Sequence, residues 1–154
     1  MKKSKFLLVI AVIFVAIFVI TLCVSCGDDK DKEEGTFTLV IAGEKTTEYV
    51  LELSIIKDNG VTDALDYLKE KEGVIVEYTT SVYGAFFNQV GELKSSDADR
   101  KYVAFYTNVE NDFDVSEYAT TYEYKDIILR NSGVGASSMT VKDKAIILIT
   151  LATY

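Results

Sequence analysis

The chain has one long uncharged apolar run near its amino terminus. Only the residues after this run are expected to form a folded domain. Lys2, Lys3 and Lys5 precede the run Phe6–Ile20, which contains no charged residue. A basic end followed by an apolar stretch is the pattern that the secretory machinery reads, with the basic end held in the cytoplasm. We therefore expect residues 1–25 to be a signal segment that takes no part in the fold.

The two cysteines of the chain, Cys23 and Cys26, both lie at the outer end of this run. Because no cysteine follows them, a disulfide framework is excluded. A CxxC redox or metal centre needs a folded surround, and here the surround is the apolar segment itself. The two cysteines therefore point to processing of the signal segment, and we expect no metal site there.

The residues around Cys26 resemble a bacterial lipobox. Val24 and Ser25 precede the cysteine and Gly27 follows it. The resemblance implies that Cys26 is lipidated, with palmitate as an expected acyl group, and becomes the mature amino terminus. Cys23 is the poorer candidate, because it stands where the pattern usually has leucine. The alternative is an uncleaved signal anchor of about 20 apolar residues. Both interpretations tether the chain to the extracytoplasmic face of the cell membrane.

Residues 26–35 carry a run of charged side chains and no apolar side chain after Cys26. Such a segment cannot bury enough surface to offset its ordering entropy, so we expect a flexible tether. Loss of residues 1–25 removes three lysines and no acid, and changes the net charge from −8 to −11. This acidity excludes a nucleic-acid partner, which needs a basic face, and keeps the domain off anionic lipid.

From residue 36 onward, short apolar runs alternate with polar turns. Thr36–Ala42 and Glu48–Ile55 predict a β-hairpin, because they are rich in β-branched and aromatic residues and are separated by a Gly-Glu-Lys turn. Further strands are predicted over 74–79, 85–90, 101–107 and 144–151. With one helix among them, we expect an α+β, β-grasp-like fold over residues 36–154, with a mostly antiparallel sheet and one packed helix.

The single helix is predicted over residues 61–71, where the apolar residues take a helical period. Thr62 suits the N-cap position, and Asp63 and Asp66 suit the first turn, where the helix dipole favours negative charge. Val61, Leu65 and Leu68 fall on one stripe. We expect this stripe to lie on the sheet.

Five short motifs occur in order between about Asn59 and Ile149, and together they resemble a known family, although each alone is weak. They are Gly60–Leu65, Tyr83–Phe87, Lys101–Asn108, Gly133–Ser137 and Val141–Asp143. The family is similar to the carboxy-terminal domain of transcobalamin, and its members are commonly exported or lipid-anchored in Gram-positive bacteria. In transcobalamin the related domain covers one side of a corrinoid. The resemblance implies small-molecule capture at an extracytoplasmic surface, and it implies no catalysis.

Two departures from the family pattern affect the ligand. Val103 stands where the family usually has tryptophan, and Lys144–Ala145 replace its Gly-Asp. The first change removes a large ring that packs on a ligand or fills the core. We also expect no helical partner domain here, so a corrinoid would need a second protein or would bind weakly. Ligand identity is therefore not carried over from the family.

The segment Val109–Ser132 is longer and more polar than its family counterpart and is rich in tyrosine and acid. Tyrosine presents a rigid face with a polar tip at low entropic cost, which suits a recognition loop. The alternative is a hairpin whose tyrosines cover the edge of the sheet. Asp112–Glu117 faintly resembles a calcium loop, but Glu117 stands where that loop needs glycine, so no metal is expected.

No pattern in the chain predicts an enzyme. Histidine is absent, and Ser137 and Ser138 have no base at a motif spacing. We therefore expect a binding module without catalysis or cofactor that holds a small molecule, with a corrinoid such as cobalamin as the specific candidate. The expected ligand surface is Tyr83, Phe86, Tyr106, Tyr118 and Tyr122. The alternative is a cell-surface protein interaction or assembly module whose acidic loop docks a basic partner.

Overall fold

The computed structural model describes residues 34–82 and 84–153. The expected signal segment 1–25, the tether as far as residue 33, Cys26 and Tyr83 lie outside the described residues. Lipidation and membrane attachment therefore stay predictions. Within the described ranges, none of the helices has the length and apolar character needed to cross a bilayer.

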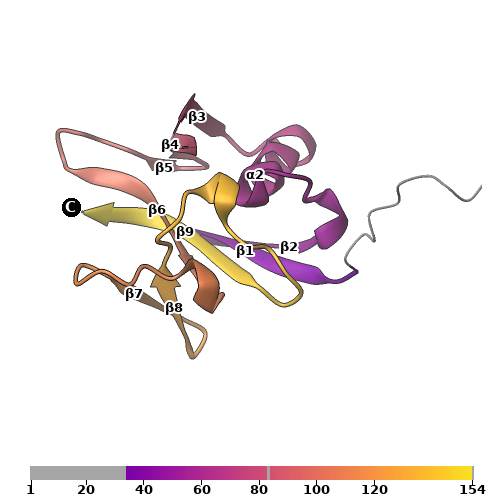
Figure 1. Cartoon of the computed structure of the whole chain (residues 1–154). Coiled ribbons are helices and arrows are strands. Elements are labelled where there is room, and N and C mark those ends of the chain that lie inside the picture. Colours follow the sequence, from indigo (N-terminus) through magenta and orange to yellow (C-terminus); the bar gives the residue numbers. More distant parts are fainter. Residues whose placement is uncertain (1–33, 83, 154) are drawn as a thin grey trace, which may run out of the picture. The chain divides into compact units, whose positions relative to one another are not determined.

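The described chain is built mainly from strands, with one α-helix between the second and third (Figure 1). The strands are β1 (Thr36–Ala42), β2 (Thr46–Glu52), β3 (Val76–Ser81), β4 (Gly84–Val90), β5 (Leu93–Lys94), β6 (Lys101–Thr107), β7 (Thr121–Tyr124), β8 (Ile127–Asn131) and β9 (Ile146–Thr153). The helix is α2 (Gly60–Lys71), and three short 3-10 helices are η1 (Leu53–Ile55), η2 (Glu110–Asp112) and η3 (Ala136–Ser138).

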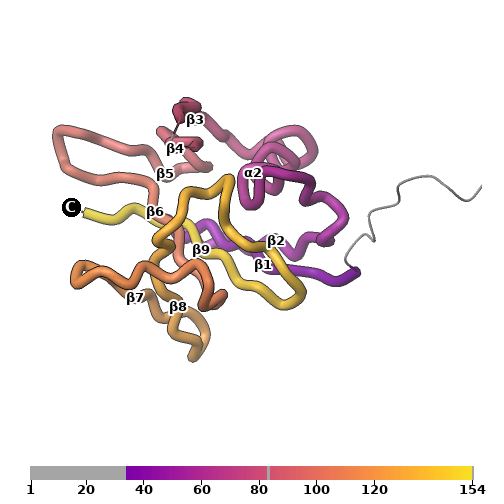
Figure 2. Tube along the Cα trace, in the orientation of Figure 1, coloured from indigo at the N-terminus to yellow at the C-terminus, as the bar shows by residue number. Residues whose placement is uncertain are grey.

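The strands form two sheets. A six-stranded sheet has the order β2-β1-β9-β6-β8-β7, and a three-stranded sheet has the order β3-β4-β5. β9 pairs in parallel with β1, whereas the other strand pairs are antiparallel. Figure 2 traces the yellow carboxy-terminal strand beside the indigo β1. The expected α+β fold, with a mostly antiparallel sheet and a single packed helix, is confirmed.

The helix packs on one face of the six-stranded sheet and forms the main core. Val61, Leu65 and Leu68 are fully buried, as the predicted stripe requires. From the sheet they meet alternate residues of β1 and β9, namely Phe37, Leu39, Ile41, Ile147 and Ile149. The period of two in these strands places the set on one face, so helix and strand patterns agree on a common core.

The start of the helix differs from the expectation. Its N-cap is Asn59, and Thr62 is the third helical residue, buried among the core side chains. The N–H groups that precede the helix are bonded instead by Asp63. Its Oδ2 accepts the Lys57 N–H at 2.7 Å and the Asn59 N–H at 2.9 Å. These bonds lower the pKa of Asp63 although its partial burial acts to raise it. The carboxylate therefore fixes the chain that enters α2.

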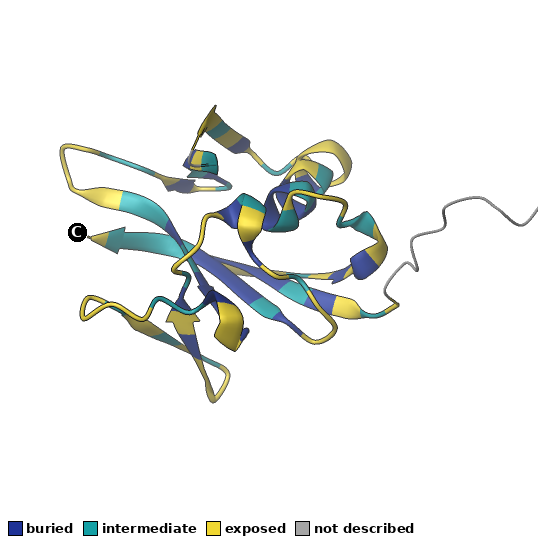
Figure 3. Cartoon of the chain, in the orientation of Figure 1, coloured by how far each residue is buried: buried dark blue, intermediate teal, exposed yellow. Residues whose placement is uncertain are grey.

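A second, smaller core lies on the opposite face of the sheet, beneath the β7–β8 hairpin. Val40, Tyr106, Leu129 and Leu148 are buried there. The hairpin extends far enough for Lys125 Nζ, in its turn, to contact Glu48 Oε2 on β2 at 2.7 Å. Figure 3 shows dark blue over most of β1 and over the first half of β9. Burial on both faces explains why residues 39–42 form an uninterrupted apolar run.

Three predicted strand ends shift for local reasons. The strand expected to reach Ile55 stops at Glu52, because Ile56 N–H bonds to the Leu53 carbonyl and closes η1. Val74 N–H bonds to the Leu68 carbonyl at the end of α2, so β3 begins two residues later. Lys144 has a φ of +62°, which delays β9 until Ile146.

Candidate functional site

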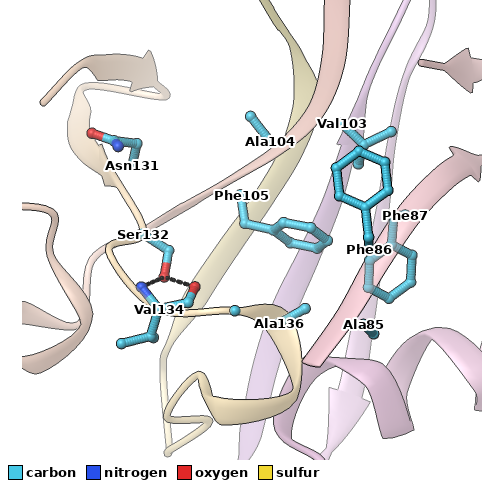
Figure 4. Close-up of a pocket in the computed structure, with 11 residues that line it drawn as sticks. Ala85, Phe86, Phe87, Val103, Ala104, Phe105, Asn131, Ser132, Val134 and Ala136 are labelled. Atoms are coloured by element: carbon cyan, nitrogen blue, oxygen red, sulfur yellow. Dashed lines mark hydrogen bonds between the residues drawn. The ribbon is translucent and has the colours of Figure 1, made fainter. Parts of the chain in front are cut away.

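An open cleft of about 180 Å³ lies where the two sheets approach each other (Figure 4). Three segments line it: Ala85–Phe87 of β4, Val103–Phe105 of β6, and residues 131–136, which run from the last residue of β8 to the first residue of η3. From the last segment come Asn131, Ser132, Val134, Gly135 and Ala136. The side chains that line the cleft are mostly apolar, with one amide and one hydroxyl among them, and polar atoms nevertheless make up more than half of its exposed surface.

Aromatic rings make the apolar side of the cleft. Phe87 is buried, and its ring centroid lies 5.3 Å from that of Phe105 in an edge-to-face arrangement. Phe86, one residue earlier, points the opposite way and is 52% exposed. Its ring centroid lies 6.4 Å from that of Tyr102. Figure 4 shows the Phe86, Phe87 and Phe105 side chains gathered beside Val103. Phe86 therefore offers a ring to an incoming molecule while Phe87 anchors β4 in the core.

The opposite wall, residues 131–136, is held by hydrogen bonds to its neighbours. Ser132 N–H donates to the Phe105 carbonyl at 2.8 Å, and Gly133 N–H donates to the Asp112 carbonyl at 2.8 Å. The Ser132 hydroxyl donates to the Val134 carbonyl at 2.8 Å and accepts the Val134 N–H at 3.2 Å. The wall is thus tied to β6 on one side and to η2 on the other.

Two acidic side chains behind this wall fix it in place. Asp112 is buried, and its carboxylate accepts the Thr140 N–H at 2.6 Å and the Thr140 hydroxyl at 3.0 Å. Asp114 accepts the Asn131 amide at 2.9 Å. Hydrogen bonds from Ser116 and from this amide lower the pKa of Asp114. Both carboxylates position the wall and do not line the cleft.

The start of α2 presses directly on η3, the far end of the wall. A Cβ on Gly60 would lie 2.6 Å from the Met139 carbonyl oxygen and 2.9 Å from that of Ala136. Gly84, which opens β4, approaches the Ser137 hydroxyl in a similar way, with 3.0 Å left for a Cβ. Both glycines also have positive φ. Close main-chain packing together with the positive φ explains the glycine at position 60, and the positive φ explains the glycine at position 84.

The expected ligand residues are divided between different places. Phe86 lines the cleft. Tyr106 is only 6% exposed on the other face of the sheet, where its hydroxyl bonds to Thr120 Oγ1 at 3.0 Å and its ring lies 5.8 Å from the Tyr122 ring. Tyr118 is 79% exposed in the loop before β7 and does not line the cleft. The structure thus brings Tyr106 and Tyr122 together in the second core, apart from Phe86.

Several cleft residues were not among the expected ligand residues. Val103 and Phe105 stand in a strand whose bounds were predicted, but their face was not assigned. Residues 133–136 belong to the Gly133–Ser137 motif, which entered only through the family resemblance and was not among the expected ligand residues. The sequence signal for these residues is the glycine content of two motifs, at Gly60 and at Gly133–Ser137, because glycine permits the close approach that the structure shows between them. Across the described ranges, no group of three or more Cys, Asp or Glu side chains is arranged to hold a metal ion.

Comparison with known proteins finds solved structures with a similar fold. No family model matches the chain, and no curated protein matches it. Haptocorrin, solved in complex with cobinamide, superposes with a TM-score of 0.57 at 11% identity, over 84% of this chain. A proposed metal-binding protein from Ruminococcus gnavus aligns at 19% identity over 79% of this chain and 99% of that chain, with a TM-score of 0.48. The chain spans 28% of haptocorrin's length, and the likeness supports the fold relationship only.

Proposed function

We propose that the chain is a binding module without catalytic activity that holds the edge of a small molecule in the cleft between β4 and β6. The observation that carries this proposal is the exposed Phe86 ring at a cleft with mostly apolar side chains and an opposite wall held by hydrogen bonds. The polar side chains of its described lining are an amide and a hydroxyl. These groups can orient a ligand, and they supply no general base.

A corrinoid is the ligand that we propose first. Support comes from the relationship in fold to haptocorrin, whose solved complex contains cobinamide. Sites that enclose a ligand of drug size measure about 300–1,000 Å³, whereas this cleft has about 180 Å³. A corrinoid would therefore insert only one edge and leave most of its surface exposed. We expect micromolar or weaker binding unless a second protein covers the other side.

We place this activity at the outer face of the cell membrane, with the domain attached through Cys26 or through an uncleaved anchor. The support is the sequence pattern of residues 1–26. Metabolic labelling with a palmitate analogue tests the lipid anchor, with Cys26→Ser and Cys23→Ser compared side by side. Label that is lost only with Cys26→Ser supports lipidation at Cys26, and label that is retained in both variants argues against it.

Spectrophotometric titration with cobinamide and cobalamin tests the ligand. Val103→Trp adds an indole to a half-buried cleft residue and is expected to weaken binding about tenfold or more, because the ring occupies the ligand's space. Val50→Trp is the matched control, because Val50 is 70% exposed on β2 and does not line the cleft. Equal loss in both variants, or no binding by the unaltered chain at high micromolar corrinoid, would remove the corrinoid proposal.

A second candidate function, docking of a protein partner, is favoured by the loop before β7. Val115 and Tyr118 expose large apolar surfaces there, next to Glu117. The loop is shaped by Asp114 Oδ1, which accepts the Ser116 N–H at 2.8 Å. A basic partner held by this loop would bind more weakly as salt is raised, because exposed charges are screened. Salt-independent capture from a surface extract would argue against this function.

A further inference from the structure

The side chains that line the cleft carry no formal charge. The described lining consists of phenylalanine, valine, alanine and glycine residues together with Asn131 and Ser132, and it contains no Lys, Arg, Asp or Glu. A charged ligand group placed there would lose part of its hydration and would find no opposite charge in this lining. The cleft therefore favours a neutral ligand, and its two polar side chains determine which neutral groups it can hold.

The Asn131 side chain already has a partner at each end. Its Nδ2 donates to Asp114 Oδ2 at 2.9 Å, and its Oδ1 accepts the Thr120 N–H at 2.7 Å. Asn131 is also buried, and Figure 4 shows its amide on the side away from the phenylalanine rings. Ser132 is therefore the better placed of the two polar side chains to meet a ligand.

The Ser132 hydroxyl keeps one acceptor position. A hydroxyl offers one proton and two lone pairs. The proton goes to the Val134 carbonyl at 2.8 Å, with the Asp112 carbonyl at 3.4 Å as a weaker competitor for it. One lone pair accepts the Val134 N–H at 3.2 Å, and no further hydrogen bond among the described residues uses the other. A ligand can therefore complete this hydroxyl only by donating a hydrogen bond to it.

The volume of the cleft suits one small ring. An apolar cavity of about 150 Å³ holds a benzene molecule, and this cleft has about 180 Å³. Phe86, Phe87 and Phe105 supply apolar surface from the two strands, and Ser132 lies on the opposite wall (Figure 4). A flat ring with a hydrogen-bond donor at one end can therefore contact both sides.

We propose that the cleft binds an uncharged, flat group that carries a primary carboxamide, with the ring against Phe86 and Phe105 and an amide N–H donated to Ser132 Oγ. A carboxylate of the same shape is rejected, because it has no proton to donate and its charge would be partly dehydrated without a partner. This inference rests on the proposed function, because it names the chemical class of ligand that the same cleft holds.

Three matched probes separate the donor from the charge. Benzamide is neutral and donates, methyl benzoate is neutral and donates nothing, and benzoate is charged and donates nothing. Titration of the full chain, followed by the amide shifts of Phe86, Val103 and Val134, should show millimolar binding of benzamide. Methyl benzoate should bind about fivefold more weakly, and benzoate about tenfold or more. Binding of either other probe as tight as that of benzamide, or no saturable shift with benzamide, overturns the inference.

Two variants test the role of the hydroxyl itself. Ser132→Ala removes the acceptor, whereas Ser132→Thr keeps a hydroxyl at the same position. The preference for benzamide over methyl benzoate should disappear in Ser132→Ala and persist in Ser132→Thr. A preference that is retained in Ser132→Ala, or lost equally in both variants, overturns the assignment to Ser132. Where neither variant folds, the three probes on the unaltered chain decide.

Cobinamide is titrated in parallel, so that failure of this inference and failure of the proposed ligand are distinguished. Cobinamide binding without a preference for benzamide rejects this inference alone. A preference for benzamide without cobinamide binding rejects the corrinoid proposal alone. No saturable shift with any of the four molecules rejects both.

Discussion

Replacement of Gly60 by alanine should lower the free energy of unfolding by about 3 kcal/mol, from left-handed strain and overpacking together. Gly60 has a φ of +49°, a region that costs an L side chain about 1–2 kcal/mol. The added Cβ would also lie 2.6 Å and 2.9 Å from the carbonyl oxygens of Met139 and Ala136. These are main-chain atoms and cannot rotate away, so α2 or the 136–139 segment must move. That shift adds a cost of about 1–2 kcal/mol, in the range of overpacking.

Gly73→Ala separates the two contributions. Gly73 has a φ of +69°, but nothing lies within 4 Å of the position of its Cβ. Its substitution should therefore cost only the conformational part, about 1–2 kcal/mol. Urea unfolding followed by circular dichroism measures both variants. Gly60→Ala should be the less stable, and it should also weaken ligand binding, because Ala136 lines the cleft. Equal losses in the two variants would refute a rigid contact between α2 and η3.

Three further predictions concern the surroundings of the cleft. Asp112→Ala should destabilise the domain by about 1–3 kcal/mol in urea unfolding, because it removes a buried carboxylate that accepts two hydrogen bonds from Thr140; a loss below about 0.5 kcal/mol would contradict this role. The pKa of Asp63 is lowered in the fold, so its contribution is present above the unfolded pKa and is lost as pH falls through the lower folded value. Stability measured between about pH 5 and pH 2 should therefore fall less steeply in Asp63→Asn, and parallel curves would contradict the assignment. Lys125→Met should change stability by less than about 1 kcal/mol at any salt concentration, because its pair with Glu48 is exposed; a larger loss would show that the hairpin depends on this pair.

Local patterns predicted the elements well where one kind of residue dominates. The bounds of Thr36–Ala42 and Lys101–Thr107 agree with β1 and β6, because both runs are rich in β-branched and aromatic residues. The helix pattern failed at its start, because Asn59 and Thr62 are both residue types that suit an N-cap, and the N-cap is Asn59. Which of them becomes the N-cap depends on long-range contacts of the chain before α2, and the local sequence does not specify these contacts.

The cleft was only partly predictable, because both faces of the main sheet are apolar. Phe105 and Tyr106 are neighbours in sequence, yet Phe105 lines the cleft and Tyr106 lies in the second core. Alternation shows that they face opposite ways, but it does not show which face the helix covers and which face the β7–β8 hairpin covers. That assignment depends on the order of strands distant in sequence, β9 between β1 and β6.

Mapping of backbone amide shifts during a cobinamide titration tests most directly whether ligands enter between β4 and β6. Saturable shifts are expected for Phe86, Val103 and Val134, with little change at Tyr106 and Tyr122. Shifts centred on Tyr118 and Tyr122, or saturable binding that leaves Phe86 and Val103 unchanged, would contradict it.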